Sequence, residues 1–289
     1  MPSLRADVFV ALPIPFKGVN GIADGVWSPI SCTLIHGERE AVLVDTPVTI
    51  DQTEELIEWI EKRVPGKRLT KIYVTHGHGD HWFGLPLLVR RFPGVQTIAT
   101  AGTIEHMKGQ ISPTTFREFW TACFPGGQIP EQTEMATPLG PSNEFYLEGH
   151  LFKAVEVGQS DTHDSTVLWI PDIKLAVCGD VVYGDVHQML AECTTRELRA
   201  AWIASISKVE ALKPELVVPG HKQPHELDGT FHLQNTRRYI ETFQELIDAG
   251  AKDAEELSRE MVKKFPTRFN MSALNSGCLA AFSASGSAQ

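Results

Sequence analysis

Short apolar runs alternate with turn residues along the first third of the chain, a pattern typical of strands that lie in a sheet. The predicted strands are Val8 to Leu12, Ile30 to Ile35, Ala41 to Val44, Leu69 to Val74 and Val95 to Thr100. Between them, apolar positions at helical spacing, several followed by proline and glycine, predict helices. These helices are Thr49 to Arg63, Trp82 to Phe92 and Thr103 to Lys108.

The pattern returns to strands from Phe145 and becomes helical beyond Pro219. The later strands are predicted at Phe145 to Leu147, Leu151 to Val157, Thr166 to Ile170, Leu175 to Cys178 and Leu216 to Val218, and the helices at Thr195 to Leu212, Gly229 to Ala249 and Asp253 to Lys264. Two batches of strands with flanking helices predict an α/β fold, a four-layer αββα sandwich. We expect a single domain over residues 1–289, with added helices at about 229–265 and a flexible tail from Ser283.

Composition and charge narrow the partners of the protein. Its 289 residues are 42% hydrophobic, and 26 Lys and Arg against 36 Asp and Glu give a net charge of −10. This charge repels phosphate backbones and anionic membranes, so we expect a small-molecule substrate rather than nucleic acid or a membrane, with the oligomeric state left open. The five scattered cysteines form no Cys-x-x-Cys pair, and no apolar stretch reads as a signal peptide or a membrane span. These features predict a cytoplasmic protein.

A predicted strand is followed directly by the segment Thr75-His76-Gly77-His78-Gly79-Asp80-His81-Trp82. His76 and His78 are two residues apart, which puts both imidazoles on one side of extended backbone, and the glycines let the chain curl around a small ion. Asp80 and His81 then turn toward a second position. Imidazole and carboxylate are donors that a cation such as zinc takes, so the run predicts parts of two coordination shells. By chance, such a run is expected on the order of 10⁻³ times in this chain.

This segment resembles the metallo-β-lactamase superfamily, whose His-x-His-x-Asp-His signature is matched by His76, His78, Asp80 and His81. Three further family landmarks follow in family order, namely an aspartate that ends an early strand, a Gly-Asp and a Pro-Gly-His. They are matched by Asp45, Asp180 and His221. The matches run from residue 45 to residue 221, so the resemblance covers most of the chain and implies the αββα fold.

The resemblance also implies the chemistry of the site. It implies two divalent metal ions, with Zn²⁺ expected, and a metal-bound hydroxide that attacks the substrate. Asp180 is then the bridging carboxylate and His221 the last ligand histidine. Asp80 is expected both to bind metal and to orient the attacking water. Asp45 is expected to hydrogen-bond a ligand histidine rather than to bind metal itself.

The third histidine of the family's first metal site has no direct counterpart. The family pattern is Gly-His-Thr-x-Gly-Ser-Thr before a strand, whereas the strand from Thr166 follows Ser160-Asp161-Thr162-His163-Asp164-Ser165. When Ser165-Thr166 is aligned with the Ser-Thr of the pattern, Asp161 takes the position of the family histidine, and His163 lies two residues after that position. We therefore expect Asp161 to be the metal ligand, with His163 as the alternative. A carboxylate adds negative charge and should soften the Lewis acidity of that metal.

The expected reaction is the opening of a small cyclic amide or ester, a lactam or a lactone, with a role in detoxification. Tyr183 lies three residues after Asp180, as does a tyrosine in acyl-homoserine lactone lactonases, and this resemblance implies a hydrogen bond to the carbonyl oxygen or the leaving group of the substrate. His187 is predicted either to line the pocket or to lie at the surface. The remaining histidines have no motif around them, and the aromatic residues are more typical of core than of a pocket wall. These are His36, His106, His150, His225 and His232, and Trp82, Phe83, Trp120 and Phe124.

Two other functions compete. A glyoxalase-II-like thioester hydrolase would need basic residues for an anionic substrate, and only Lys222 stands beside His221. A mononuclear iron persulfide dioxygenase-like oxidoreductase would leave His81 unused, so the complete four-residue signature argues against it. Fold membership alone does not choose among these substrates.

Overall fold

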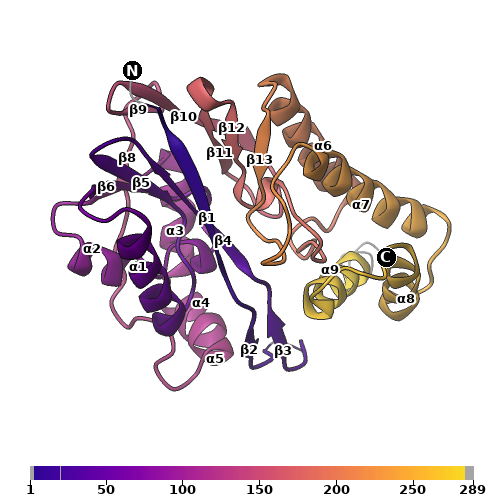
Figure 1. Cartoon of the computed structure of the whole chain (residues 1–289). Helices are drawn as coiled ribbons and strands as arrows, with labels where there is room; N and C mark the ends of the chain where they lie inside the picture. The colour runs from indigo at the N-terminus through magenta and orange to yellow at the C-terminus, as the bar shows by residue number, and fades with distance from the viewer. Residues whose placement is uncertain (1–2, 20, 284–289) are drawn as a thin grey trace.

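Two β-sheets lie face to face in the computed structural model, which describes residues 3–19 and 21–283 (Figure 1). The first sheet has the strand order β1-β4-β5-β6-β7-β8. Its strands are β1 Arg5–Ala11, β4 Ile30–His36, β5 Glu40–Val44, β6 Arg68–Tyr73, β7 Gln96–Ala99 and β8 Thr137–Pro138. The strands β5 to β8 pair in parallel, so their carboxyl ends lie at one edge of the sheet.

The second sheet has the strand order β13-β12-β11-β10-β9. Its strands are β9 Glu144–Leu147, β10 His150–Gly158, β11 Ser165–Ile170, β12 Leu175–Val177 and β13 Leu216–Val218. The strands β12 and β13 are parallel, and the other pairs are antiparallel. A separate hairpin of β2 Ile14–Phe16 and β3 Gly25–Trp27 lies at the bottom of the view in Figure 1.

Helices cover the outer face of each sheet. The helices α1 Ile50–Arg63 and α2 Leu85–Arg91 lie over the first sheet, and α6 Arg196–Ala211 and α7 Phe231–Asp248 lie over the second (Figure 1). This arrangement confirms the four-layer αββα sandwich. The other helices are α3 Ala101–Gln110, α4 Pro113–Thr115, a π-turn at Phe116–Trp120, α5 Thr121–Cys123, α8 Ala254–Lys264 and α9 Met271–Ser283, with 3₁₀ turns at Gly79–His81, Pro171–Ile173 and Gly179–Val181.

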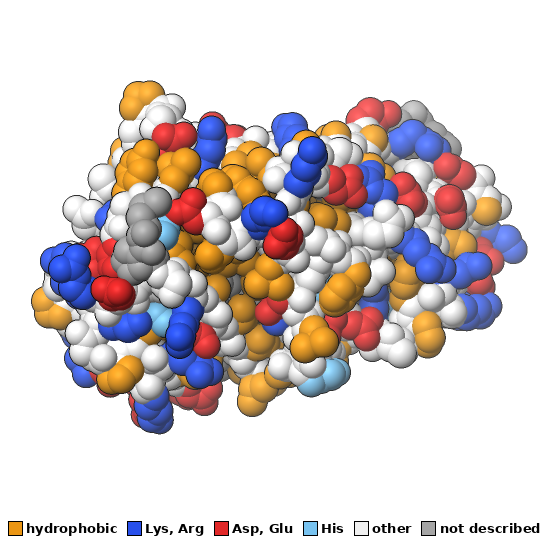
Figure 2. Space-filling view, turned by 45° about the horizontal axis from the view of Figure 1, so that its top comes forward, with side chains coloured by type: hydrophobic (Ala, Val, Ile, Leu, Met, Phe, Trp, Pro, Cys, Tyr) orange, Lys and Arg blue, Asp and Glu red, His pale blue; other side chains and the backbone are white. Residues whose placement is uncertain are grey.

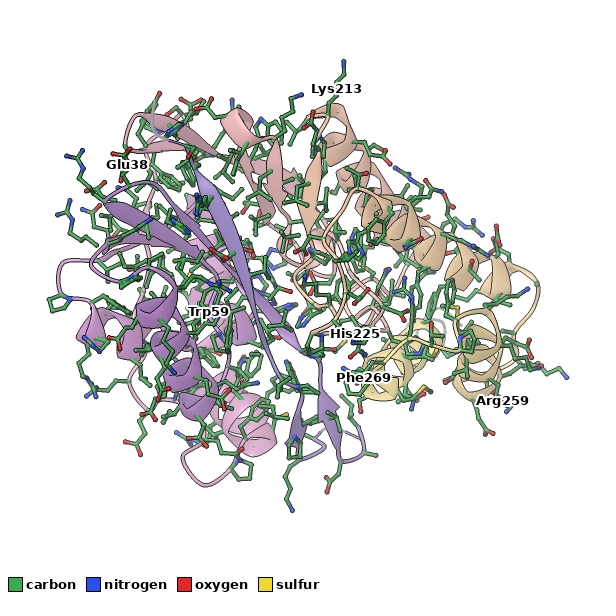
Figure 3. The ribbon with its side chains drawn as sticks, in the orientation of Figure 1. Glu38, Trp59, Lys213, His225, Arg259 and Phe269 are labelled. Carbon is green, nitrogen blue, oxygen red and sulfur yellow. The ribbon has the colours of Figure 1, made fainter. Side chains whose placement is uncertain are left out.

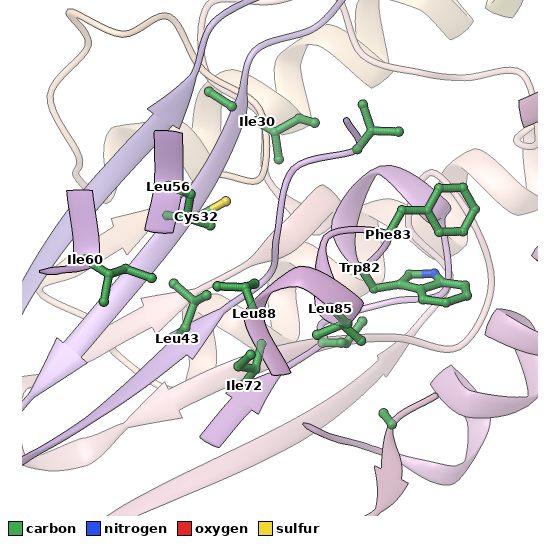
Figure 4. Packing of buried hydrophobic residues seen from close by; sticks show 14 of the residues in the cluster. Ile30, Cys32, Leu43, Leu56, Ile60, Ile72, Trp82, Phe83, Leu85 and Leu88 are labelled. Carbon is green, nitrogen blue, oxygen red and sulfur yellow. The ribbon is translucent and has the colours of Figure 1, made fainter. Parts of the chain in front are cut away.

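Apolar side chains of the central strands alternate between the two faces of the first sheet. Leu43 packs with Leu56 of α1 and Leu88 of α2 in the outer cluster (Figure 4). Its neighbours Val42 and Val44 point the other way, into the cluster between the sheets. Because both faces are buried, β5 is a continuous apolar run in the sequence, as is usual for central strands of α/β proteins.

Two helix boundaries have local causes. Thr49 caps α1 by a capping box with Gln52, in which the hydroxyl of Thr49 accepts from the Gln52 amide N–H. The helix predicted over Trp82 to Phe92 was too long, since α2 begins at Leu85. The indole Nε1–H of Trp82 donates to the carbonyl oxygen of Gly77 at 2.7 Å, which ties Trp82 to the preceding loop.

Some elements were not predicted, namely β2, β3, β8, α9 and the short helices around residue 115. The helix α9 contains three serines, an asparagine and a glycine, which are weaker helix formers than alanine, and its apolar residues give a weak helical pattern. It forms because Leu274 and Cys278 are buried in the core cluster of the second sheet. The added helical region therefore extends beyond the predicted residue 265. The tail was predicted to be flexible from Ser283, but Ser283 is the last residue of α9, and the rest of the tail, 284–289, lies outside the described residues.

Charged side chains of both signs are spread over the face shown in Figure 2, and hydrophobic side chains gather toward its middle. Trp59 of α1 and Arg259 of α8 lie on opposite sides of the molecule in Figure 3. Across residues 3–19 and 21–283, no helix is long and apolar enough to span a bilayer.

Candidate functional site

The signature residues lie where strands of both sheets end at one edge of the sandwich. Asp45 follows β5 and His76 follows β6, while Asp180 and His221 follow β12 and β13. Each of these two strand pairs is parallel, so its carboxyl ends meet. The two sheets are joined at this edge, because the Thr166 amide donates to the carbonyl oxygen of Thr75 at 3.0 Å. Pairing of the strands therefore gathers residues that lie far apart in the sequence.

Two glycines allow the loops at this edge to approach one another. A Cβ atom on Gly220 would lie 2.2 Å from Oδ1 of Asp180, and one on Gly179 would lie 2.4 Å from Oγ1 of Thr75. Gly179 also has φ +48°, a backbone conformation that L side chains rarely adopt. A side chain at Gly220 would push apart the segments that carry His221 and Asp180, and one at Gly179 would push the Asp180 segment away from Thr75 and His76.

Each of the four clustered histidines has one ring nitrogen held by a neighbour. The pairs are His76 Nδ1 with Thr75 Oγ1 at 3.0 Å, His78 Nε2 with Glu192 Oε1 at 2.9 Å, His81 Nδ1 with Asp45 Oδ2 at 3.0 Å, and His221 Nδ1 with the Pro29 carbonyl oxygen at 2.7 Å. A partner on one nitrogen fixes the tautomer and orientation of the ring and leaves the other nitrogen as a donor to metal. In all four rings that second nitrogen lies among the candidate ligands.

One group of candidate ligands is formed by His76, His78 and Asp161, whose donor atoms lie within 4.8 Å of one another. Nδ1 of His78 is 2.9 Å from Oδ2 of Asp161. Within the described chain, Nε2 of His76 and Oδ2 of Asp161 are buried and satisfy no hydrogen-bond geometry. Buried polar atoms without a hydrogen bond are costly unless something else binds them. These atoms converge on a position that a cation would fill.

A second group is formed by Asp80, His81 and His221. The Nε2 atoms of His81 and His221 face each other at 3.4 Å, and each lies 3.2 Å from an oxygen of Asp180. Ligand bonds of about 2.0–2.1 Å in a tetrahedral zinc site put neighbouring donor atoms roughly 3.3 Å apart. The spacing matches that of ligands around one ion. Asp180 also groups with His76, so it lies between the two sets.

The charges of the site fit divalent cations. Asp80, Asp161 and Asp180 are all buried. Burial raises the pKa of Asp161 to about 6, with His78 opposing the shift and Asp180 adding to it. Burial lowers the pKa of His221, but the attraction of Asp180 outweighs it and the net shift is upward. Buried carboxylates need a counter-charge, and together with the two donor groups they fit two divalent cations.

The structure separates the two candidates for the third ligand of the first group. The side chain of Asp161 is 1% exposed, whereas that of His163 is 60% exposed. Nδ1 of His163 pairs with Oδ2 of Asp164 at 2.8 Å, and its ring stacks on His106 with centroids 4.4 Å apart. Asp161 is therefore brought into the cluster and His163 is left outside it.

The remaining predicted site residues lie around the cluster. Asp45 accepts from the amide and the hydroxyl of Thr75, in addition to its contact with His81. The hydroxyl of Tyr183 donates to Oδ2 of Asp180 at 2.6 Å. His187 is buried, lines the pocket and contacts the hydroxyl of Tyr239 through Nδ1. The chemical roles of these residues stay predictions.

A pocket of about 460 Å³ opens onto the cluster. Its floor includes His78, Asp80, Asp161, Asp180 and His221, and its apolar wall includes Phe16, Trp27, Phe119 and Trp120. Among the aromatic residues considered from the sequence, Trp120 lines this pocket. Trp82, Phe83, Trp120 and Phe124 all belong to the buried core cluster, as their position near helices suggested.

Three contacts of the ligands were not predicted. The indole Nε1–H of Trp27 donates to Oδ2 of Asp80 at 2.8 Å, and Glu192 holds the Nε2 edge of His78. The ring of His106 lies 5.3 Å from that of His78, although the sequence gave it no role. None of these residues is part of a motif.

Residues 25–221 match the family model described as Metallo-beta-lactamase superfamily. The chain belongs to the metallo-beta-lactamase superfamily. The match spans the whole candidate site, from the strand of Trp27 to His221. Together with the two donor groups, membership of this superfamily supports a metal-dependent hydrolase.

Individual members of the superfamily are similar to this chain over most of its length. The metallo-beta-lactamase type 2 of Bacteroides fragilis is 25% identical over 75% of this chain and 77% of the relative. The enzyme of the same name from Bacillus cereus is 28% identical over 70% of each chain. The solved structure of a metallo-beta-lactamase from Pontibacter korlensis has a TM-score of 0.58 at 20% identity, and covers 83% of this chain and 99% of that one. This last likeness concerns the superfamily fold.

Proposed function

We propose that this protein opens a small cyclic amide or ester, a lactam or a lactone, with two divalent metal ions, zinc being the expected metal. The observation that carries the proposal is the pair of donor groups, linked by Asp180, at the floor of a pocket of about 460 Å³. A pocket of this size suits a small molecule, and the ligand residues form part of its surface. When bound, the cations would polarise the scissile carbonyl and lower the pKa of a water molecule.

Two residues of the chain, Asp80 and Tyr183, are proposed to act on the attacking water and on the substrate. Asp80 presents its carboxylate to the pocket, and the hydrogen bond from Trp27 fixes its orientation, so Asp80 is the proposed residue that orients the attacking water. Burial and the nearby carboxylate of Asp180 raise the pKa of Tyr183 well above its usual value, so its hydroxyl keeps its proton at neutral pH. Tyr183 is therefore the proposed donor to the carbonyl oxygen or the leaving group, to which its hydroxyl would turn from Oδ2 of Asp180 when the substrate binds.

The same geometry weighs against the two competing functions. A glutathione-type thioester carries carboxylates, but Nζ of Lys222 is bonded to Asp228 at 2.6 Å, and Lys222 is absent from the described lining of the pocket. A mononuclear iron site would leave His81 without a role. Instead, His81 lies in the centre of the second donor group, with Asp45 holding its other ring nitrogen.

The test is a hydrolysis panel of lactams, lactones and thioesters with zinc-saturated protein, read by the mass of the ring-opened product. We expect hydrolysis of a lactam or a lactone that is lost with a chelator and restored by added zinc. His163→Ala is the matched control, because this exposed side chain lies outside the cluster and its loss should leave turnover unchanged. Hydrolysis of thioesters alone, or iron-dependent oxygen consumption, would replace the proposed function with one of its competitors.

A further inference from the structure

We infer that the pocket selects electrically neutral lactams or lactones with a hydrophobic body and discriminates against ring substrates that carry a carboxylate. This inference rests on the proposed function and names the substrate class within it. Three independent features of the pocket support it: the absence of cationic side chains from its described lining, the excess of carboxylates, and an aromatic wall whose indole N–H groups are already bonded within the protein.

No lysine or arginine belongs to the pocket lining in the part of the chain that the structure describes. Two cations whose sequence neighbours or contacts belong to the lining, Lys222 and Arg268, are turned to other partners. Lys222, next to His221, is 3% exposed and bonds to Asp228 and to the carbonyl oxygen of Glu226. The guanidinium of Arg268 donates to the carbonyl oxygen of Val186 and lies 4.6 Å from the centre of the Tyr239 ring. A substrate carboxylate that enters the pocket would therefore lose its hydration without gaining a side-chain cation as a partner. This desolvation costs binding free energy.

Carboxylates, in contrast, surround the pocket. Glu118 and Glu192 line it, and neither is a member of the donor groups. The candidate ligands include three aspartates, Asp80, Asp161 and Asp180, because Asp161 stands where the family pattern has a histidine. Two divalent cations and three aspartates together carry one net positive charge. With a histidine at position 161 the same centre would carry two. The attraction of the centre for an anionic substrate is weakened accordingly.

The aromatic wall is arranged for apolar contact. The indole N–H of Trp27 is bonded to Asp80, and that of Trp120 to Oε1 of Gln110 at 2.9 Å, so both polar edges are satisfied within the protein. The rings of Phe16 and Phe119 pack against Trp27 with centroids 5.5 and 6.4 Å away. The aromatic surface that lines the pocket is thus left to a hydrophobic part of the substrate.

The first experiment compares substrates that differ only in charge. Dihydrocoumarin and its carboxylate-substituted derivative form a lactone pair, and a penicillin methyl ester and the free penicillin form a lactam pair. We expect kcat/KM of the neutral member to exceed that of the anion by about tenfold or more, mostly through KM, with a smaller ratio at high ionic strength. Equal values, or a preference for the anion, would overturn the inference while leaving the proposed function standing.

The second experiment reverses one charge in the pocket. Glu118→Lys should shift the neutral-to-anion ratio toward the anion by about tenfold, since it places a cation on the wall. Glu58→Lys is the matched control, because Glu58 is an exposed glutamate on α1, outside the pocket lining, and its reversal should leave the ratio unchanged. An equal shift in both variants would show a general effect of net charge and would contradict the inference.

A binding measurement separates failure of the inference from failure of the proposed function. Chroman and chroman carboxylate cannot be hydrolysed, and their binding to zinc-loaded and metal-free protein can be followed by quenching of tryptophan fluorescence, since Trp27 and Trp120 line the pocket. We expect the neutral ring to bind about tenfold more tightly in both states. If no lactam or lactone is hydrolysed, the proposed function fails, and this pair still decides the charge selectivity.

Discussion

Nδ1 of His78 lies 2.9 Å from Oδ2 of Asp161, across a position that a metal ion would share between them. The carboxylate oxygen is buried and lacks hydrogen-bond geometry to any described group. The other edge of the His78 ring is held by Glu192, whose second oxygen accepts from the hydroxyl of Thr162 at 2.6 Å. The loop that carries Asp161 thus also supports the partner of His78.

The first prediction concerns the identity of the third ligand in that group. Asp161→Ala should weaken metal binding by at least about 100-fold, because it removes a buried donor, whereas His163→Ala should change it less than about threefold. Titration of metal-free protein with zinc against a competing chelator measures both. The reverse ranking would show that His163 turns inward when metal binds, and equal small effects would mean that neither side chain is a ligand.

The second prediction is a stoichiometry of two metal ions per chain, because there are two separate groups of donors, His76-His78-Asp161 and Asp80-His81-His221. Asp180 belongs to neither group but forms a third with His76 of one and His81 of the other, so it links the two. Elemental analysis of metal-saturated protein should give two ions per chain. Asp80→Asn should weaken the binding of one of the two ions and reduce turnover at least about 100-fold, since it removes a ligand charge beside the reacting carbonyl. Circular dichroism should be unchanged. A single ion in the saturated wild-type protein, or full turnover in the variant, would contradict the proposed site.

The third prediction concerns the hydroxyl of Tyr183. If it donates to the substrate in the transition state, Tyr183→Phe should reduce kcat by about 10²–10³, the cost of one oxyanion-stabilising donor. Metal content should stay close to that of the wild type. A loss of metal that parallels the loss of turnover would limit Tyr183 to positioning Asp180, with which it forms its hydrogen bond.

The fourth prediction is a pH dependence of stability that comes from His187. Burial and the neighbouring Arg268 lower its pKa to about 4, against about 6.5 in an unfolded chain. Below pH 6.5 the unfolded chain binds a proton that the folded chain takes up only near pH 4, so acid favours unfolding. The contribution of His187 is therefore complete above pH 6.5 and is lost as the pH falls toward 4.

Urea unfolding of metal-free wild type and His187→Gln at pH 7 and pH 4.5 measures this contribution. The free energy of unfolding should fall by about 2 kcal/mol less in the variant than in the wild type over this interval. Comparing the two pH slopes cancels the constant cost of losing the contact with Tyr239. Parallel slopes would mean that His187 titrates normally in the folded protein.

The sequence by itself determined the layers of the fold and the central ligand run. Apolar periodicity is a local property, so β4, β5, β6 and α1 could be predicted to within a residue or two. The donor run from His76 to His81 is contiguous, so its side chains can be predicted to be metal ligands from their types and spacing alone. The preference for Asp161 over His163 came from counting residues back from the strand at Thr166, which the sequence pattern itself predicts. Because the start of this strand is known, the position of each residue in the short preceding loop is restricted.

Only the tertiary structure decided which groups support those ligands and what the pocket offers a substrate. Glu192 is 114 residues from His78, and Trp27 is 53 residues from Asp80, and no local pattern links either pair. The helix α9 forms because its apolar side chains are buried, although its serines and glycine are poor helix formers. The orientation of Lys222 away from the pocket is likewise set by its contact with Asp228. Local propensity acts over a few residues, whereas the charge and shape of a pocket are sums over segments that only folding brings together.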